Sequence, residues 1–395
     1  MGGHVVVLGA GPGGMAAARA LRRDLPPEVR VTVVDRVDEQ RLGLAFLLIM
    51  RGLRTPAEVM VRPSAVLPSG VSFLHAEVTA IDLAARRVQS DQGELGYDAL
   101  VLALGAEVVP EAVPGLEEAI AAGVAGHFYT LGGALHLRER LTCFSGGRIL
   151  VVVARLPYKC PPAPYEGALL IAEQLREQGL IDALRIDLFT PEPQPLAVAG
   201  PVVGQQLAML LGERGIVLHT GQTLEGVDAA HCEAIFSSGT REPFDLLVVV
   251  PPNRPPAVVR QAGLVSETGW VPVALPSMRT PVDGVWAVGD VTAVRLPNGL
   301  LMPKAAVFAQ QQGEAAARAI ARSLGANLPE PEVSGRGRCW FITGSGEAGS
   351  VEGDFLAEPA PVVRFSPPTT ERFQEMEAEL LAWIAQGRPE SGHSA

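Results

Sequence analysis

The amino-acid sequence predicts an α/β fold made of two Rossmann-like domains and a C-terminal segment. Apolar strands alternate with helices along most of the chain, which is typical of parallel sheets covered by helices. A strand–helix–strand unit occurs twice, with first strands beginning near residues 4 and 147. A glycine-rich turn joins the first strand to the first helix. Together these observations favour a duplicated nucleotide-binding fold over a short-period repeat.

The first domain is expected to form from two separate parts of the chain. Residues 71–89 are typical of an antiparallel ribbon, and the apolar run 43–50 fits either a core strand or a core helix. The other expected elements are strands 4–10, 29–35, 97–105 and 282–290 and helices 13–23 and 304–323.

Pro110 and Pro114 mark the expected crossing into the second domain. This domain is expected to contain strands 147–154, 184–190 and 244–252 and helices 166–178 and 203–213. We therefore predict four parts: 1–113 and 256–328 for the first domain, 114–255 for the second, and 329–395 for the C-terminal segment.

A short amphipathic helix is expected near the end of the C-terminal segment. One stripe of this helix is apolar, whereas its opposite face is acidic. An acidic face is repelled by anionic lipid, so we expect the helix to pack on the body of the protein. The apolar stripe consists of Phe373, Met376, Leu380, Leu381 and Ile384.

The composition sets further limits on function. Hydrophobic residues make up 48% of the chain and charged residues 19%, enough for sizeable cores. The net charge of −11 and the lack of a basic run argue against nucleic-acid binding. Four cysteines are too few for a disulfide scaffold, so any pairing is expected to be redox or catalytic. No apolar run is long enough to span a membrane, but the mean hydropathy of +0.23 permits peripheral membrane contact.

The first glycine-rich turn predicts a dinucleotide site. Gly9, Gly11 and Gly14 form G-x-G-x-x-G, with Gly13 in the same turn. Glycines allow backbone N–H groups at a helix N-terminus to approach a pyrophosphate. Asp35 ends the next strand, 21 residues past Gly14, where a carboxylate can accept hydrogen bonds from ribose hydroxyls. This motif alone is compatible with either NAD or FAD.

A later segment favours FAD. Gly289 and Asp290 end the apolar strand of AVGD (287–290), and a helix follows from about residue 304. An aspartate in that position can hold a ribityl hydroxyl. The positive end of a helix can stabilise the negative charge of a reduced flavin.

The corresponding turn of the second domain lacks the glycine motif. Pro161, Pro162 and Pro164 have no N–H groups to offer a pyrophosphate, so NAD binding in the usual pose is disfavoured. Glu192, after the next strand, stands where a ribose-binding carboxylate could lie, but it is interpreted as a surface residue. The turn instead carries Cys160, which is either a structural cysteine or a reactive one. Lys159 and the following helix N-terminus are expected to favour its thiolate form.

At this point the chain resembles the sulfide dehydrogenase flavoproteins. This group comprises the flavoprotein subunit of flavocytochrome c sulfide dehydrogenase and sulfide:quinone oxidoreductase, within the disulfide-reductase-like flavoproteins with two dinucleotide-binding domains. The resemblance extends to about residue 385 and is carried by PYKCPPAPYEGALLIA, AVGD, MPKAAVFAQQQG and CWF (339–341). The segment HFYTLGGALHLRERL (127–141) fits the flavocytochrome branch better than the quinone branch.

The resemblance implies roles for particular residues. Cys160 and Cys339 match the family's redox disulfide beside the flavin, and Glu166 matches a carboxylate of the same motif that is a candidate proton carrier. Lys304 and Ala305 match the start of the flavin-facing helix. Lys159 and Lys304 are the only lysines among the 32 basic residues, and both lie in these redox motifs. A lysine ammonium is a compact point charge that a planar guanidinium does not replace.

Some features depart from the family pattern. The cysteine that attaches FAD covalently in the flavocytochrome subunit is absent, with Gly43 near its place, so FAD is expected to be bound non-covalently. Cys143 and Cys232 do not match the third cysteine of the quinone enzymes and are interpreted as structural. There is no C-x-x-C-H haem motif, and no metal site is expected.

The resemblance implies an FAD-dependent oxidoreductase that oxidises sulfide through Cys160 and Cys339. The expected electron acceptor is a quinone or a c-type cytochrome. Two alternatives remain open: an NAD(P)H-dependent dehydrogenase of the type II NADH dehydrogenase kind, and a flavin-bound sulfur carrier without turnover. A quinone would require an apolar channel, expected near Phe341 and the C-terminal helix. The chain shows no secretory signal, which is typical of a cytoplasmic or membrane-peripheral protein, whereas the related flavocytochromes are periplasmic.

Overall fold

The computed structural model describes residues 3–180 and 183–385. Its first half is built on a five-stranded sheet with the order β19-β7-β1-β2-β3, in which every neighbouring pair is parallel. The segment 282–290 was expected to join this sheet, and β19 confirms that expectation. The strands are β1 (His4–Leu8), β2 (Arg30–Asp35), β3 (Val71–His75), β7 (Ala99–Leu102) and β19 (Val285–Ala287).

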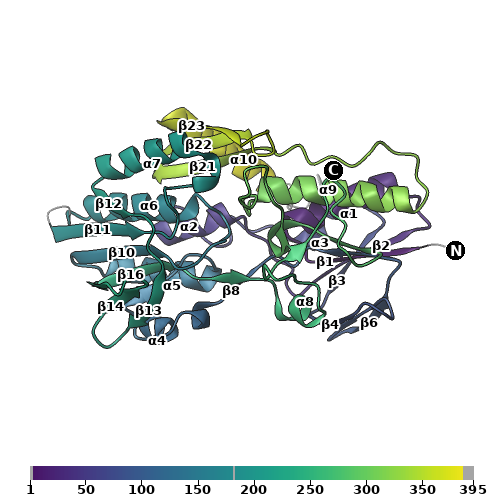
Figure 1. Ribbon diagram of the computed structural model, residues 1–395, viewed down its shortest axis with the longest axis horizontal. Coiled ribbons are helices and arrows are strands. Elements are labelled where there is room, and N and C mark those ends of the chain that lie inside the picture. Colours follow the sequence, from purple (N-terminus) through teal and green to yellow (C-terminus); the bar gives the residue numbers. More distant parts are fainter. Residues whose placement is uncertain (1–2, 181–182, 386–395) are drawn as a thin grey trace, which may run out of the picture.

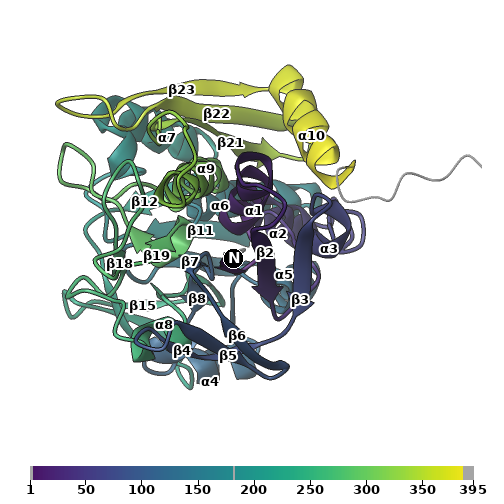
Figure 2. The same cartoon turned by 90° about the vertical axis from the view of Figure 1, so that its right-hand side faces the viewer.

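Helices α1 (Pro12–Asp24) and α9 (Ala306–Ser323) lie side by side above the first sheet (Figures 1 and 2). Their backbones approach closely because small residues line the contact: a Cβ added to Gly313 would lie 2.2 Å from the carbonyl oxygen of Gly13. Alanines on both helices fill the rest of the contact. This close packing places the start of α9 near the glycine-rich turn at the start of α1.

The second half repeats the architecture. Its five-stranded sheet has the order β12-β11-β10-β16-β9, again with all neighbouring pairs parallel. The strands are β9 (Ala125–Gly126), β10 (Gly147–Val153), β11 (Leu184–Phe189), β12 (Ile216–His219) and β16 (Leu246–Val250). The helices are α4 (Leu116–Ala121), α5 (Leu131–Thr142), α6 (Ala163–Glu177) and α7 (Pro201–Glu213).

Two chain crossings join the halves at one place. The short strands β8 (Glu107–Val108) and β17 (Asn253–Arg254) pair antiparallel there, and β8 lies between the halves in Figure 1. The segment that leaves the first half and the segment that returns to it are therefore paired by backbone hydrogen bonds.

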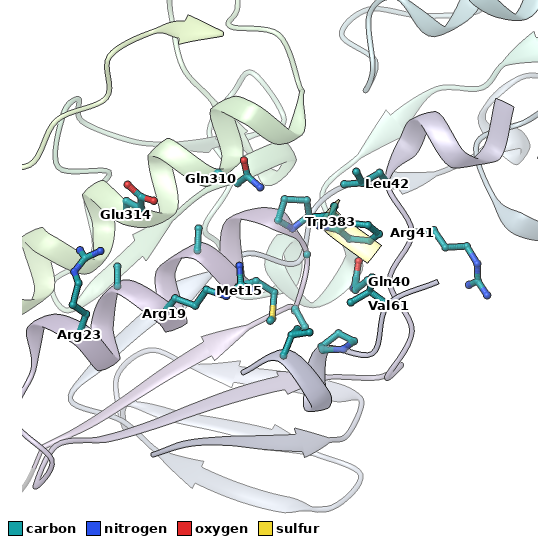
Figure 3. Close-up of a pocket in the computed structure, with 17 residues that line it drawn as sticks. Met15, Arg19, Arg23, Gln40, Arg41, Leu42, Val61, Gln310, Glu314 and Trp383 are labelled. Atoms are coloured by element: carbon teal, nitrogen blue, oxygen red, sulfur yellow. The ribbon is translucent and has the colours of Figure 1, made fainter. Parts of the chain in front are cut away.

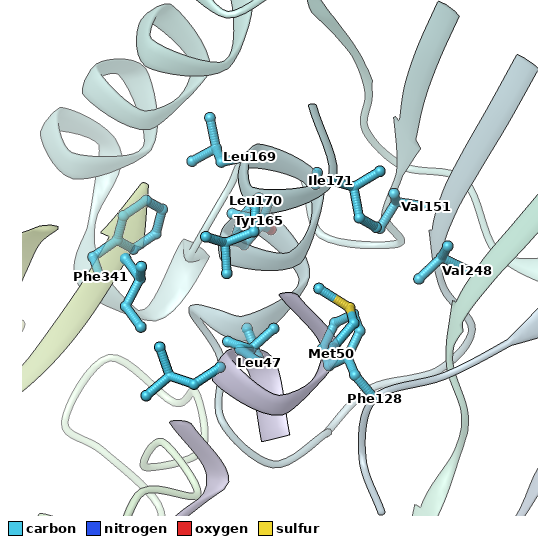
Figure 4. Packing of buried hydrophobic residues seen from close by; sticks show 14 of the residues in the cluster. Leu47, Met50, Phe128, Val151, Tyr165, Leu169, Leu170, Ile171, Val248 and Phe341 are labelled. Carbon is cyan, nitrogen blue, oxygen red and sulfur yellow. The ribbon is translucent and has the colours of Figure 1, made fainter. Parts of the chain in front are cut away.

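The apolar run 43–50 is a core helix, α2 (Gly43–Arg51), which ends at Gly52 in the left-handed conformation. It contributes Leu47 and Met50 to a hydrophobic core shared with α6 and the second sheet (Figure 4). The position of α2 brings a segment of the first half against the helices of the second.

The antiparallel ribbon expected over 71–89 is only partly correct. β3 joins the first sheet in parallel, because its residues pair with those of β2. The ribbon begins later and consists of β4 (Val78–Asp82), β5 (Arg87–Ser90) and β6 (Gly93–Gly96).

The remaining short elements lie outside the two five-stranded sheets. A second small antiparallel sheet packs beside the second domain, and a two-stranded parallel pair follows α8. These elements are α3 (Pro63–Val66), β13 (Leu224–Asp228), β14 (Glu233–Phe236), β15 (Arg241–Pro243), α8 (Ala257–Gln261), β18 (Val271–Pro272) and β20 (Thr292–Ala293).

The C-terminal segment forms a three-stranded antiparallel sheet that the sequence patterns did not predict. β21 (Arg336–Gly344), β22 (Glu347–Asp354) and β23 (Val362–Thr369) lie across the top of the molecule in Figure 2. The expected helix is α10 (Thr370–Ala385), and it packs on this sheet. Leu381 was wrongly placed in its buried stripe, since its exposed fraction is 53%; the other four residues of the stripe are buried.

Within the described residues, no helix is both long and apolar enough to cross a membrane. The same part of the chain holds no cluster of His, Cys, Asp or Glu side chains suited to a metal ion.

Candidate active site

The glycine-rich turn between β1 and α1 has no room for side chains at two of its positions. Gly9 has φ +101°, and a Cβ on Gly14 would lie 1.9 Å from the Gly9 carbonyl oxygen. Gly11 is different, because a Cβ there would meet nothing within 4 Å. The Gly11 side of the turn therefore faces open space at the positive end of α1.

That open space is a cavity of about 280 Å³ (Figure 3). Gly11 and Pro12 line it at the start of α1, and Arg19 lines it further along the same helix. Gln310 comes from α9 and Trp383 from α10. The cavity therefore combines a helix N-terminus with cationic and amide groups, a set that suits an anionic diphosphate.

The Asp35 carboxylate forms a hydrogen bond to the backbone of the glycine-rich turn. Its Oδ2 accepts a hydrogen bond from the N–H of Ala10 at 2.7 Å, and its Oδ1 accepts one from the N–H of Val37 at 3.0 Å. A carboxylate has about four acceptor positions, so these two contacts leave room for a ribose hydroxyl.

The segment after β19 and the start of α9 meet around a second, small cavity of about 10 Å³. Gly289, Asp290, Lys304 and Ala305 all line it. The N–H of Gly289, which has φ +74°, donates to Oε1 of Gln312 at 2.7 Å. Four residues expected to bind the cofactor thus lie together, although they come from two separate segments.

The Lys304 side chain links the start of α9 to the segment after β19. Its Nζ donates to the carbonyl oxygens of Asp290 at 2.7 Å and Thr292 at 2.8 Å. The ammonium also lies 3.4 Å from the centre of the Trp270 ring, a cation–π contact. Burial lowers the pKa of Lys304 to about 8, against the opposing effect of the Asp290 charge.

These features fit a bound flavin dinucleotide. Gly11 leaves the cradle that a diphosphate needs, and Asp35 has acceptor positions free. Asp290 is half-buried beside the start of α9, where a ribityl hydroxyl can be held. A flavin in this site would accept two electrons from one donor and pass them on.

Cys160 lies in the turn between β10 and α6, next to the start of α9. Its N–H donates to the carbonyl oxygen of Lys304 at 2.9 Å, and Lys159 and Lys304 form a parallel bridge. Its φ is +56°, a conformation that non-glycine residues rarely adopt and that occurs often at functional sites. The turn is therefore attached through its backbone to the segment that leads into α9.

Cys339 and Glu166 complete the group. Cys339 lies on β21, which packs on α6. Glu166, in the first turn of α6, is almost fully buried at 1% exposure, and its Oε1 accepts a hydrogen bond from the N–H of Ile342 at 2.8 Å. This bond ties the carboxylate to the strand that carries Cys339.

The charges of Cys160, Cys339 and Glu166 affect one another's pKa values. Burial raises the pKa of Cys160 well above its usual value, and the charges of Glu166 and Cys339 raise it further. Burial and Glu166 raise the pKa of Cys339 to about 12. Both cysteines are free thiols here and partly exposed.

The expectation that Lys159 makes Cys160 a thiolate is wrong for this state. Burial has the largest effect on the thiol, whereas the Lys159 ammonium is directed to the carbonyl oxygen of Ala106 at 3.4 Å. Burial also lowers the pKa of Lys159, although Asp290 and Cys160 oppose this.

Glu166 has an altered pKa suited to proton transfer. Burial raises the pKa of its carboxyl to about 8, and the Ile342 N–H only partly offsets this. Near neutral pH such a group exchanges a proton readily with a thiol or a sulfide.

Glu192 is not the surface residue that its sequence position suggested. It is 6% exposed, and its Oε2 accepts hydrogen bonds from the hydroxyls of Tyr165 at 2.6 Å and Tyr158 at 3.0 Å. In this second Rossmann-like domain, a carboxylate at the end of the second strand is where a nucleotide ribose would be held. Here the protein's own tyrosines occupy it.

Two residues of this region were not singled out from the sequence. Tyr129 and His127 lie in the segment before α5, which sequence patterns marked only as part of the family resemblance. Burial and then Lys159 lower the pKa of His127 to about 4, and Tyr129 is 5% exposed. Their burial depends on contacts with distant segments, so no local signal identified them.

The other two cysteines lie apart from this group. Cys143 is exposed at the end of α5, and Cys232 lies in the turn between β13 and β14. Phe341, near which a channel was expected, is fully buried and packs edge-on against Phe365, so it belongs to the core.

The fold and the site define a flavoprotein oxidoreductase with two dinucleotide-binding folds, in which the Cys160 turn lies next to the start of α9. The comparisons agree. Residues 3–153 and 168–313 match the model of the pyridine nucleotide-disulphide oxidoreductase family. Residues 134–184 match the central region of the sulfide dehydrogenase [flavocytochrome c] flavoprotein chain.

Similar proteins support the same placement. The chain is 25% identical to the mitochondrial sulfide:quinone oxidoreductase of Mus musculus, over 92% of this chain and 80% of that protein. It is 26% identical to the sulfide-quinone reductase of Aquifex aeolicus, over 82% and 77%. The crystal structure of the Aquifex aeolicus sulfide:quinone oxidoreductase superposes with a TM-score of 0.86 at 23% identity, covering 98% of this chain and 91% of that one.

The chain therefore belongs to the pyridine nucleotide-disulphide oxidoreductase family, and within it the chain is similar to the sulfide dehydrogenase and sulfide:quinone oxidoreductase flavoproteins. This confirms the fold class and the resemblance inferred from the sequence. The protein is a flavin-dependent oxidoreductase.

Proposed function

We propose that this protein oxidises sulfide through a redox pair formed by Cys160 and Cys339, with non-covalently bound FAD taking the electrons and a quinone receiving them. The observation that carries the proposal is the meeting of three groups from separate segments. The Cys160 turn, Glu166 on α6 and Cys339 on β21 are joined by hydrogen bonds to each other's elements and to the start of α9.

The first step is thiol–disulfide exchange by the substrate. Hydrosulfide attacks the Cys160–Cys339 disulfide, so that a new S–S bond forms to one cysteine and the old S–S bond breaks. The electron pair of the broken bond leaves on the other cysteine as a thiolate. The proton of the attached sulfur passes to Glu166, whose raised pKa matches it to this task.

FAD supplies the electron-accepting chemistry when it is bound. The chain's own residues prepare for it: Gly11 leaves space for the diphosphate, Asp35 and Asp290 offer acceptors for hydroxyls, and Lys304 braces the 290–292 segment. A second sulfur nucleophile then attacks the persulfide, carries away the sulfane sulfur, and leaves a free thiolate. Loss of two electrons from the two thiolates restores the disulfide.

The acceptor is assigned from the relatives. Both sulfide:quinone enzymes named above pair sulfide with a quinone, which favours a quinone here. A c-type cytochrome is the second candidate because the net charge of −11 would steer a basic partner toward the protein. Peripheral membrane contact would accompany quinone use.

NAD(P)H is disfavoured as an electron donor by the second domain. Three prolines stand in the turn where a pyrophosphate would need N–H donors, and Glu192 is occupied by Tyr158 and Tyr165. A sulfur carrier without turnover would use the same cysteines, but it would not reduce an acceptor repeatedly.

The test is a sulfide titration of the FAD-loaded protein, followed by turnover with a soluble quinone analogue or cytochrome c. With sulfite present as the second sulfur nucleophile, we expect one sulfide per flavin to bleach the visible flavin absorption in the wild type. Cys160→Ser and Cys339→Ser should abolish bleaching, whereas Cys143→Ser should leave it unchanged. Bleaching of Cys160→Ser at the wild-type rate contradicts the disulfide route. A single bleaching event without turnover on any acceptor identifies a carrier, and rapid stoichiometric bleaching by NADH restores the dehydrogenase alternative.

A further inference from the structure

Cys160 lies in a turn whose backbone is held by three hydrogen bonds. Its N–H donates to the carbonyl oxygen of Lys304 at 2.9 Å, and its own carbonyl oxygen accepts from the N–H of Ala163 at 2.9 Å. The N–H of Lys159, the preceding residue, donates to Oδ1 of Asn253 at 2.9 Å. Cys160 has φ +56°, a left-handed conformation that residues with a Cβ disfavour. Such a backbone persists only where its surroundings impose it.

A side-chain hydrogen bond spans the same turn. The hydroxyl of Tyr158 lies 3.2 Å from the carbonyl oxygen of Pro161, so the contact runs from two residues before Cys160 to the residue after it. The same hydroxyl lies 3.0 Å from Oε2 of Glu192, a second acceptor. Tyr158 is 4% exposed and Glu192 is 6% exposed, so bulk water has little access to these contacts. The Tyr158 side chain is therefore fixed against the Cys160 turn.

Glu192 is itself held by groups other than Tyr158. Its Oε2 accepts from the hydroxyl of Tyr165 at 2.6 Å, and its Oε1 accepts from the N–H of Ala197 at 3.2 Å. Tyr165 is fully buried on α6. Two tyrosine hydroxyls thus share one carboxylate oxygen. Within the described residues, only the Tyr158 hydroxyl also bonds to the Cys160 turn.

We propose that Tyr158, held by Glu192, is a positioning residue that keeps Cys160 in the geometry needed for a disulfide with Cys339. This inference rests on the proposed function and adds what fixes one member of its thiol pair. A disulfide tolerates only a narrow range of Cβ separations and of torsion about the S–S bond, so the backbone of each cysteine must be fixed. Asn253 supports the same turn from the short strand β17.

The proposal gives a use to a carboxylate that no ribose is expected to reach. In a Rossmann-like domain, an acidic residue after the second strand commonly accepts hydrogen bonds from ribose hydroxyls. Here phenol hydroxyls take that place, from Tyr158 and Tyr165. Because Tyr158 precedes Cys160 by two residues, the acceptor at the ribose position now acts on the turn that carries the thiol.

The positioning acts on the equilibrium between the two thiols and their disulfide. With oxidised dithiothreitol, the S–S bond of the reagent breaks, the Cys160–Cys339 bond forms, and two electrons and two protons pass to dithiothreitol. A fixed Cys160 raises the effective concentration of one thiol at the other, which favours the protein disulfide. A turn released from Tyr158 would adopt other backbone conformations, so the disulfide would become easier to reduce.

The test compares Tyr158→Phe with Tyr165→Phe in the FAD-loaded, full-length protein. Each variant removes one hydroxyl from Oε2 of Glu192, so both should lower the unfolding temperature by a similar amount. Only Tyr158→Phe also removes a contact to the Cys160 turn. Each protein is equilibrated without oxygen at set ratios of oxidised to reduced dithiothreitol and is then quenched in acid. Alkylation and mass spectrometry quantify Cys160 and Cys339 as thiols or as a disulfide.

We expect the equilibrium constant for the Cys160–Cys339 disulfide to fall at least tenfold in Tyr158→Phe, a shift in reduction potential of about 30 mV toward easier reduction. Tyr165→Phe should keep the wild-type constant. An unchanged constant in Tyr158→Phe overturns the inference. An equal fall in Tyr165→Phe also overturns it, because the cause would then be a general loss of stability in the second domain.

Asn253→Ala provides an independent variant if Tyr158→Phe folds poorly. It removes the acceptor of the Lys159 N–H and should lower the same constant at least tenfold. Asn298→Ala is the matched control, since Oδ1 of Asn298 accepts from the N–H of Leu300 at 3.1 Å in an exposed turn. This control should keep the wild-type constant. An unchanged constant in Asn253→Ala then overturns the inference.

The wild type separates failure of this inference from failure of the proposed function. A wild-type protein that forms no Cys160–Cys339 disulfide at any ratio of dithiothreitol contradicts the proposed function itself. A wild-type disulfide whose equilibrium constant is the same in Tyr158→Phe refutes the positioning role alone.

Discussion

The backbone N–H of Cys160 donates to the carbonyl oxygen of Lys304 at 2.9 Å. One hydrogen bond thus joins the Cys160 turn of the second half of the protein to Lys304, two residues before α9 of the first half begins. The side chain of Lys304 extends the connection, because its ammonium holds the carbonyl oxygens of Asp290 and Thr292. The two lysines of this chain, Lys159 and Lys304, therefore lie where the Cys160 turn meets the segment of Asp290 and Thr292.

Replacement of Lys304 by methionine should weaken cofactor binding. The ammonium makes two hydrogen bonds and a cation–π contact in a buried position, and loss of a charged hydrogen bond costs about 1.5–3 kcal/mol. We expect FAD to dissociate at least tenfold more readily from Lys304→Met, measured by the fluorescence of released flavin. Arg295→Met, on the neighbouring exposed loop, is the matched control, and equal FAD release from both variants would contradict the bracing role.

Glu166→Gln should remove the pH dependence of sulfide oxidation. With a pKa of about 8, the Glu166 carboxyl is protonated at neutral pH and becomes a base as the pH rises through 8. The rate of flavin reduction by sulfide should therefore rise with pH to a plateau above about 8. A neutral amide cannot take the proton, so the rate should fall about 10²-fold or more and lose this rise.

Glu177→Gln is the control for that experiment, since Glu177 lies on the same helix with its side chain exposed and paired to Arg51. It should keep the wild-type pH profile. A Glu166→Gln profile that still rises through pH 8 would show that another group accepts the proton.

Removal of the hydroxyls around Glu192 should destabilise the second domain. In the double variant Tyr158→Phe and Tyr165→Phe, the buried carboxylate loses two donors, each contributing about 1.5–3 kcal/mol. We expect the free energy of unfolding in urea to fall by about 3 kcal/mol or more. Tyr97→Phe removes a hydroxyl without a partner and should leave the free energy of unfolding nearly unchanged.

Asp187 should make the free energy of unfolding fall as the pH is lowered into the acid range. It is fully buried on β11 and accepts hydrogen bonds from Arg148, Arg185 and His219, which lower its pKa to about 2 despite its burial. Because the folded-state pKa lies below the unfolded value of 3.8, its contribution is complete above pH 3.8 and is lost as the pH falls toward 2.

Asp187→Asn should therefore lose about 2 kcal/mol at pH 7, measured by urea unfolding. The difference from the wild type should shrink as the pH approaches 2. A difference that stays constant down to pH 2 would show that packing, rather than charge, is responsible.

The parts of the fold that the sequence predicted are those with strong local patterns. The apolar strands of both sheets and the turn at Gly9 and Gly11 depend on residues close together in the chain. The sheet of β21, β22 and β23 was missed because its glycine- and proline-rich strands show no apolar alternation. Its pairings, such as Cys339 with Val351, follow from the turn between β21 and β22 and from contacts with α6.

The family motifs named Cys160, Cys339 and Glu166, and the structure brings these three residues near one another, while their roles stay predictions. The pKa values of these groups could not be predicted from the sequence. The pKa of Cys160 was misjudged because adjacency to Lys159 in sequence says nothing of where the ammonium points. The burial of Glu192 also could not be foreseen, since its partner hydroxyls come from residues about thirty positions earlier.

The separation of Cys160 and Cys339 has a consequence for biosynthesis. The first thiol leaves the ribosome 179 residues before the second, which at 5–20 residues per second is a delay of roughly 10–40 seconds. During that interval the nascent chain carries Cys160 together with Cys143 and later Cys232, but it has no strand β21 to cover Cys160. Translation must therefore pass residue 339 before the proposed partner of Cys160 exists, and an oxidant met earlier would join Cys160 to Cys143 or Cys232 instead.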